Sequence, residues 1–463
     1  MPYPRFYRDV VILGIIIFLF WKIIKKEYTL LDAVAFALPF KYAYVDIGFA
    51  ILLSQGLMTL FVLWVIIKKV LVRPSKFVVV IPLLIFLIYG VLDTLLVTHI
   101  NDIKAIKVRV GSSYFREEGR YLLQIFVFIY FYLQVFAVKN FITSNRQIVQ
   151  VLRTYLLAIF LVAFLGFIQF LVFRATGMDI FPMDREAGGA VRSSVLETLG
   201  QSFARVTSLG GEPKGLGSTM ALGFATMVIL NRYEILKSKY YYLNFALYLF
   251  IIAMTFSTGA YLLLGIFLIG YPLILIFRLK KPFISTKKNL AIAAFVILGV
   301  VVSFQSIYTV LELRIFTKLS RNTSSEASDL AIYDFFQDHP EWIYFGSGLG
   351  NIHNLAMEYT PERHRQYMYN NVWVGRTGFL RIISELGVIG FLLFLFVVFS
   401  AFLNLGLFFN KDQLGNGLAL VLLFGLLFFF SRGPYLENQF LLLLSLAFAY
   451  KKKQPLNVEA RTA

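Results

Sequence analysis

Arginine is concentrated in two hydrophilic stretches, 174–214 and 308–377, which separate long apolar segments. It supplies four of the five Lys and Arg residues in the first stretch and five of six in the second. A guanidinium binds phosphate or carboxylate through two parallel hydrogen bonds, which an ammonium does not do. The pattern predicts a site for an anionic substrate. Ion pairing with acids of the same stretches is the alternative for each single arginine.

The segment Arg205–Val–Thr–Ser–Leu–Gly–Gly–Glu212–Pro–Lys–Gly–Leu–Gly217 comes directly before an apolar run. Its glycines allow the backbone to approach a ligand closely. Glu212 is placed at the transition from water to membrane, where a carboxylate could serve as a general base. The alternative interpretation is a flexible loop that contains an Arg–Glu pair.

A second segment, 375–390, opens the apolar run after the larger stretch. Arg376 would lie near the first turn of a helix, where backbone N–H groups favour anions. Arg381 and Glu385 are four residues apart, and pairing along the helix is the favoured interpretation for Glu385. The catalytic candidates are Arg205, Glu212 and Arg376, and the substrate-binding candidates are Arg192, Lys214, His353, Arg363, His364, Arg365, Arg381 and Arg432.

The composition requires a membrane to position these residues. Of the 463 residues 59% are hydrophobic and 15% are charged, whereas a soluble domain has about 45–50% apolar and about 25% charged residues. The apolar runs are about 20 residues long, which is the length of a transmembrane helix. We expect an all-α polytopic integral membrane protein with about 12–13 transmembrane helices and a large outward-facing loop that contains short helices.

Charge and residue usage exclude several classes of site. The net charge of +18 is explained by cytoplasmic loops, which collect Lys and Arg, so no nucleic-acid partner is expected. The chain has no cysteine, which excludes disulfides, thiol nucleophiles and iron–sulfur clusters. The four histidines are not at metal-ligand spacing, and we expect neither a metal nor another cofactor.

The distribution of basic residues predicts the topology. The linkers 22–27, 68–76, 139–153, 231–240, 278–288 and 410–413 and the tail 451–463 hold 23 Lys and Arg against four acids, which places them in the cytoplasm. The segment 28–44 is short and contains Pro39, so the N-terminus is outside with thirteen spans and inside with twelve. The expected regions are N-terminal helices at 1–173, an outer loop at 174–214, central helices at 215–307, a large outer loop at 308–377, and C-terminal helices with a basic tail at 378–463.

The large outer loop is expected to contain helical structure of its own. Thr323–Ser–Ser–Glu326 fits a helix-start capping box. Leu330, Tyr333 and Phe336 would then fall on one face of the helix. We expect such helices to lie against the outer membrane surface.

Three motifs carry a family resemblance. They are Arg205…Gly–Glu–Pro…Gly217, then Met254–Thr–Phe–Ser–Thr–Gly–Ala–Tyr261, then Phe345–Gly–Ser–Gly–Leu–Gly350 followed by Phe379–Leu–Arg–Ile–Ile–Ser–Glu–Leu–Gly–Val–Ile–Gly390. In order and spacing the chain resembles the O-antigen polymerase and ligase superfamily (Wzy and WaaL types). Thr258 stands where many members have Arg. Arg376 stands where ligase-type members have a catalytic His, which favours the polymerases.

The resemblance implies glycosyl transfer on the outer face of the bacterial inner membrane. The implied donor is a glycan on polyprenyl diphosphate, and the acceptor is a lipid-linked repeat unit. Fixed arginines would stabilise the diphosphate leaving group without a metal; Arg205 and Arg376 are assigned to it. Glu212 is the candidate base, ahead of His353 and His364. Membrane lipid and a chain-length regulator are the further candidate partners. A ligase that transfers to lipid A core or protein, and a transporter of a lipid-linked glycan, are the alternatives.

Overall fold

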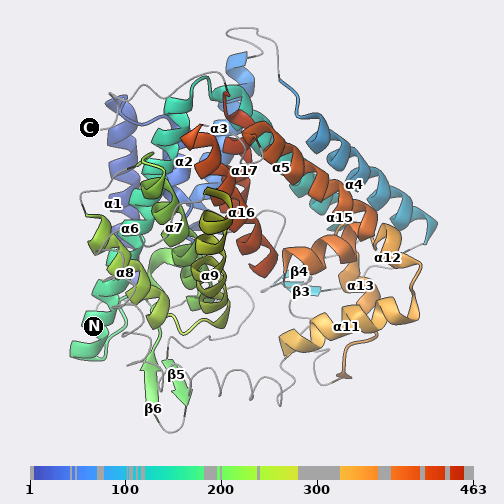
Figure 1. Ribbon diagram of the computed structural model, residues 1–463. Coiled ribbons are helices and arrows are strands. Elements are labelled where there is room, and N and C mark those ends of the chain that lie inside the picture. The colour runs from blue at the N-terminus through green and yellow to red at the C-terminus, as the bar shows by residue number, and fades with distance from the viewer. Residues whose placement is uncertain are drawn as a thin grey trace.

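The all-α polytopic membrane fold that the sequence predicts is confirmed (Figure 1). The computed structural model describes residues 5–41, 44–46, 50–69, 78–101, 103, 108–110, 113–115, 120–181, 195–198, 201–236, 240–279, 324–362, 377–406, 412–432 and 438–452. The helices are α1 Arg5–Ile24, α2 Leu30–Ala37, α3 Leu53–Ile67, α4 Ile81–Ile100, α5 Arg120–Phe141, α6 Asn145–Thr176, α7 Pro213–Arg232, α8 Tyr241–Met254, α9 Thr258–Leu279, α11 Ser324–Asp338, α12 Trp342–Phe345, α13 Ile352–Ala356, α15 Gly378–Leu405, α16 Gln413–Arg432 and α17 Asn438–Ala449. Antiparallel pairs join β1 Tyr44–Asp46 to β2 Ala50–Leu52, β3 Val108–Val110 to β4 Ser113–Phe115, and β5 Val195–Thr198 to β6 Gln201–Ala204.

Five helices are long and apolar enough to cross a membrane: α4, α5, α6, α15 and α16. On α15, Leu392, Phe396, Phe399 and Leu403 are all exposed, and their spacing of three and four residues places them on one stripe. An apolar stripe left open on a helix whose other face is buried is the surface that lipid covers. Four shorter apolar helices, α3, α8, α17 and part of α9, complete the apolar set in the described residues.

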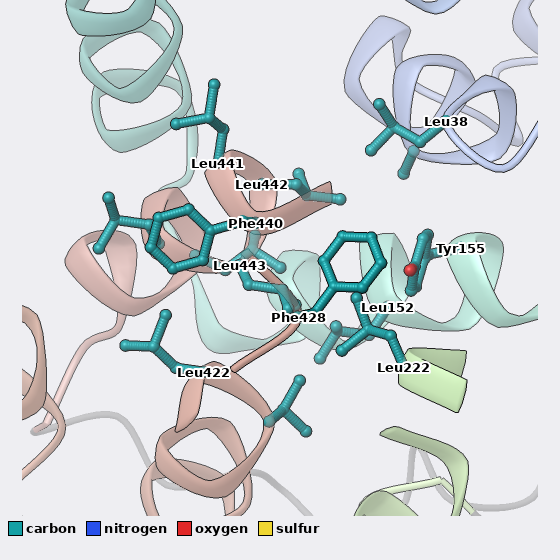
Figure 2. Close-up of a cluster of buried hydrophobic side chains, with 14 of the residues drawn as sticks. Leu38, Leu152, Tyr155, Leu222, Leu422, Phe428, Phe440, Leu441, Leu442 and Leu443 are labelled. Carbon is teal, nitrogen blue, oxygen red and sulfur yellow. The ribbon is translucent and has the colours of Figure 1, made fainter. Parts of the chain in front are cut away.

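Helix α17 lies at the centre of the bundle. Every residue from Gln439 to Ala449 is buried, as expected of a helix that is apolar on all sides. Figure 2 shows Phe440 and Leu441–Leu443 beside Phe428 of α16, with Leu152 and Tyr155 of α6 and Leu222 of α7 close by. The bundle is therefore built around α17, with α5, α15 and α16 packed on it and with side chains of α6 and α7 reaching it.

The linker 139–153 and the start of the tail at Lys451, which the sequence assigns to the cytoplasm, meet at one end of the bundle, called here the inner end. Asn145, at the start of α6, exchanges two hydrogen bonds with the backbone of Lys451 after α17. Asn404, near the end of α15, donates to the Ala447 carbonyl at 2.7 Å. Lys139, near the end of α5, donates to the Phe448 carbonyl. Because α6 starts there while α5 and α15 end there, the opposite end holds the end of α6 and the starts of α5 and α15. We call it the outer end.

Another basic linker carries a local ion pair. Lys22 donates a hydrogen bond to Glu27, and this contact lowers the pKa of the exposed Glu27 carboxyl. The chain then enters α2, which begins at a capping box formed by Thr29 and Asp32 and ends before Pro39. A helix of eight residues is about 12 Å long, so α2 alone is too short to cross a bilayer.

Candidate functional site

The Arg205–Gly217 segment is held in place by Gln169, a buried amide on the outer half of α6. Its Oε1 accepts hydrogen bonds from the backbone N–H groups of Thr207, at 3.1 Å, and Ser208, at 2.7 Å. Its Nε2 donates to Asp179 at 2.7 Å and to the Thr207 hydroxyl at 2.8 Å. One side chain thus holds the backbone of a turn for which the sequence leaves a flexible loop as the alternative. The four hydrogen bonds argue against that alternative for this part of the segment.

The same segment packs against the second motif, 254–261. The Val206 N–H donates to the Met254 carbonyl at 3.1 Å, and Arg205 Nε donates to the Thr255 carbonyl at 3.1 Å. A Cβ on Gly217 would lie 2.6 Å from the Thr255 hydroxyl, so only glycine allows this approach. Two motifs that are far apart in the sequence therefore form one structural unit, called here the Arg205 unit.

Positive charge gathers at the Arg205 unit. Arg205 is half-buried, and Lys214 in the first turn of α7 is exposed. Lys41 lies against Gly211. A Cβ atom built on Gly211 would be 3.3 Å from the Cβ of Lys41. Helices α7 and α9 both begin here, at Pro213 and Thr258, and helix starts carry partial positive charge. This arrangement can bind an anionic group, as the arginine pattern predicts. Glu212, at the position directly before α7, is half-buried.

The third motif forms a second unit from its two separated parts. The Ser347 N–H donates to the Ser384 carbonyl at 3.0 Å, and the Gly350 N–H donates to Glu385 Oε1 at 3.3 Å. Gly346 has φ of +79° and packs directly on the backbone of Gly387. The 346–351 turn is thereby fixed to the first half of α15. We call this assembly the Glu385 unit.

Arg381 and Glu385 form the ion pair that their spacing predicts. Arg381 Nε lies 3.4 Å from Glu385 Oε2, and its Nη2 donates to Gln124 of α5 at 3.2 Å. Both charged side chains are buried, and a buried pair is stable only when further hydrogen bonds satisfy it. Gln124 and the Gly350 N–H supply such bonds. Arg381 thus tethers α15 to α5.

Helix α4 forms the floor beneath the 346–351 turn. The Leu349 N–H donates to the Thr94 hydroxyl at 2.9 Å, and Asn351 donates to the Thr98 hydroxyl at 2.8 Å. Thr94 precedes the end of α4 by six residues, or about 9 Å. Gly387 lies nine residues inside α15, or about 13 Å. The turn therefore reaches into the depth of two helices that could cross a membrane.

The two units lie toward the same, outer end of the bundle. Gln169 is 24 residues from the start of α6 at the inner end, and Arg381 is 23 residues from Asn404 near that end, counted across the bend of α15 at Gly387. Helix α16 packs against both α7 and α15 and so lies between the units (Figure 1).

The remaining candidate site residues lie outside the two units or outside the described residues. His353 is fully buried in α13, and Arg432 is the last residue of α16. On α11 Leu330 and Tyr333 are exposed, while Ala331, Ile332 and Phe335 pack with α13. The placement of α11 against the membrane surface stays a prediction. Only Phe336 of the predicted set is buried. The candidates outside the described residues are Arg192, Arg363, His364, Arg365 and Arg376.

Several polar residues that position the two units were not among the predicted site residues. Gln169, Gln124 and Thr94 lie on α6, α5 and α4, inside long apolar runs. Polar side chains at such places mark contacts that the bundle must satisfy, and this was the signal in the sequence that could have found them.

No protein-family model matches the chain, and no curated protein matches it. The resemblance to the O-antigen polymerase and ligase superfamily therefore rests on the motifs themselves and on their order and spacing.

Proposed function

We propose that the protein is a polysaccharide polymerase of the bacterial inner membrane. It would transfer a glycan from polyprenyl diphosphate onto a lipid-linked oligosaccharide repeat unit on the outer face, in the synthesis of O-antigen, capsule or exopolysaccharide. The observation that carries the proposal is the pairing of the motifs into the Arg205 and Glu385 units, toward the same end of the bundle. A lipid-linked substrate would present its diphosphate near one surface of the membrane.

The chemistry of the Arg205 unit fits a diphosphate leaving group. When the glycosidic bond breaks, negative charge develops on the diphosphate, and a fixed donor in a poorly hydrated site stabilises it without reorganisation. Arg205 is held by the Thr255 carbonyl and stands beside two helix starts, so its position is set before substrate binds. In the proposal Arg376 shares this role, and Glu212 accepts the proton of the attacking hydroxyl.

The remaining candidates would hold the glycan and the lipid diphosphate. Arg381 would act from the Glu385 unit, where its contacts with Gln124 and Glu385 fix the guanidinium. The other assignments are Arg192, Lys214, His353, Arg363, His364, Arg365 and Arg432.

A transfer assay tests the proposal. The purified protein is incubated with a polyprenyl-diphosphate-linked repeat unit from the source organism, without metal or nucleotide sugar, and the product is separated on a gel. A ladder with steps of one repeat supports a polymerase. Transfer only to added lipid A core or protein would replace it with a ligase. Passage of the substrate across a vesicle bilayer without transfer would replace it with a transporter.

A further inference from the structure

Asp93 is a buried acid in an apolar helix. It lies in α4, seven residues before the outer end and thus about 10 Å inside the helix. Its exposed fraction is 6%. Among the described residues no donor reaches its Oδ2 atom. Burying a carboxyl oxygen without a hydrogen bond is costly, and an ionisable residue at such a place in a membrane helix marks a functional site.

The surroundings of Asp93 belong to the Glu385 unit. Tyr89, one turn earlier on α4, donates its hydroxyl proton to the Leu386 carbonyl at 3.0 Å and lies beside Asp93. That carbonyl precedes the bend of α15 at Gly387. The next residue, Thr94, touches Gly348, where a Cβ would be 3.2 Å from the Thr94 Cα. Asp93 is thus located where α4, the bend of α15 and the 346–351 turn meet.

Glu385 is the other acid of this unit, and both of its carboxylate oxygens already have partners within the protein. One of its oxygens accepts from the Gly350 N–H and the other faces Arg381. Asp32 of α2 is also buried with one oxygen lacking a donor, but it caps its own helix through Thr29. Among the described residues Asp93 caps no helix and forms no ion pair, and the hydroxyl proton of the neighbouring Tyr89 is donated to the Leu386 carbonyl.

A hydroxyl suits this remaining oxygen better than a cation does. Calcium takes six to eight oxygen ligands, and among the described residues no group of three His, Asp and Glu side chains could hold a metal ion. A sugar hydroxyl needs only one acceptor. The glycan of the proposed substrate carries many hydroxyls and would be delivered at this depth by its lipid.

We propose that Asp93 is a substrate-binding residue, whose Oδ2 accepts a hydrogen bond from a hydroxyl of the lipid-linked glycan. The inference rests on the proposed function and extends it by a residue on α4. Asp93 would orient the glycan from below the 346–351 turn, while the Arg205 unit binds the diphosphate.

The test compares Asp93→Asn with the matched control Asp32→Asn in the transfer assay. We expect Asp93→Asn to lower kcat/KM for the lipid-linked repeat by roughly tenfold, mainly through KM, because the amide oxygen is a weaker acceptor than a carboxylate by about 1.4 kcal/mol. Asp32→Asn should stay near wild type. A ladder from wild type and an equal ladder from Asp93→Asn would overturn the inference and leave the polymerase intact. No ladder from wild type would overturn the polymerase and the inference together.

A second measurement reports binding without turnover. A hydrophobic carbodiimide attaches to carboxyl groups inside the membrane domain, and mass spectrometry locates the adduct. We expect labelling at Asp93 that the polyprenyl-diphosphate-linked repeat suppresses, with labelling at Asp32 unchanged by the same addition. Labelling of Asp93 that saturating lipid-linked repeat leaves unchanged would contradict substrate contact, even if Asp93→Asn were unstable.

Discussion

Gly346 and Gly387 pack backbone against backbone, and this contact joins the 346–351 turn to α15. A Cβ on Gly387 would lie 2.2 Å from the Tyr344 carbonyl oxygen, and one on Gly346 would lie 2.5 Å from the Gly387 nitrogen. Gly387 also has φ of +66°, a conformation that other residues adopt only with strain. The bend of α15 at Gly387 is therefore also the point where the 346–351 turn packs on this helix.

Substitution of Gly387 should separate the turn from α15. We expect Gly387→Ala to destabilise the protein by about 1–3 kcal/mol from backbone strain, with further loss from the contact with Tyr344. Thermal unfolding in detergent measures the change. The control is Gly265→Ala in α9, where a Cβ meets nothing within 4 Å and alanine favours the helix. Equal melting temperatures for the two variants would contradict the role of the contact.

Gln169 should be required for order in the Arg205 unit. Gln169→Leu leaves the Thr207 and Ser208 N–H groups without their acceptor, at a cost of about 1–3 kcal/mol for each buried donor. We expect hydrogen exchange at 205–212 to accelerate and glycan transfer to fall. Gln337→Ala, at an exposed position of α11, is the control. Unchanged exchange at 205–212 in Gln169→Leu would show that other contacts hold the segment.

A buried polar chain beside α17 offers a test of coupling. Tyr155 donates to Gln439 Oε1 at 2.8 Å, and Gln439 Nε2 donates to the Thr219 hydroxyl at 3.0 Å. Tyr155→Phe and Thr219→Val each leave one atom of Gln439 unsatisfied, which should cost about 1–3 kcal/mol. Adding Gln439→Leu to both should cost less than the sum of the three single changes, because no partner is then left unpaired. If the changes in unfolding free energy simply add, the three side chains are not coupled as the hydrogen bonds predict.

The fold was largely predictable from the sequence, because long apolar runs and basic linkers report membrane helices directly. The pairing of motifs was not. Thr94 and Leu349 meet although they are 255 residues apart, and no local pattern encodes such a contact. The capping box at Thr29 and Asp32 also escaped the sequence interpretation, although it is local, because the surrounding apolar run suggested a span.

The sequence singles out Arg205 and Arg381 as candidate site residues, but it does not separate the environments of the two side chains. Arg381 is buried and paired, while Arg205 is half-buried beside helix starts. Side-chain burial depends on the packing partners, here α5 for Arg381 and the α8–α9 turn for Arg205. The packing of Ala331, Ile332 and Phe335 of α11 against α13 was not predicted for the same reason, since α13 decides which side of that helix is covered.

The sidedness of the membrane can be measured with single cysteines, because the chain has none of its own. We expect Lys214→Cys to react with an impermeant maleimide added to spheroplasts, since Lys214 is exposed at the outer end. Arg153→Cys, exposed on the inner part of α6, should react only after permeabilisation. The reverse pattern would invert the topology and remove the outer-face reaction.

The most direct test of the central claim is a comparison of wild type, Arg205→Lys, Arg205→Ala and Arg153→Ala in the transfer assay, at matched amounts of monodisperse protein. We predict a ladder from wild type and from Arg153→Ala, a ladder reduced by tenfold or more from Arg205→Lys, since an ammonium lacks the second hydrogen bond, and none from Arg205→Ala. A full ladder from Arg205→Ala would contradict the assignment of the diphosphate to this unit, and the absence of any glycan transfer by wild type would contradict the proposed function.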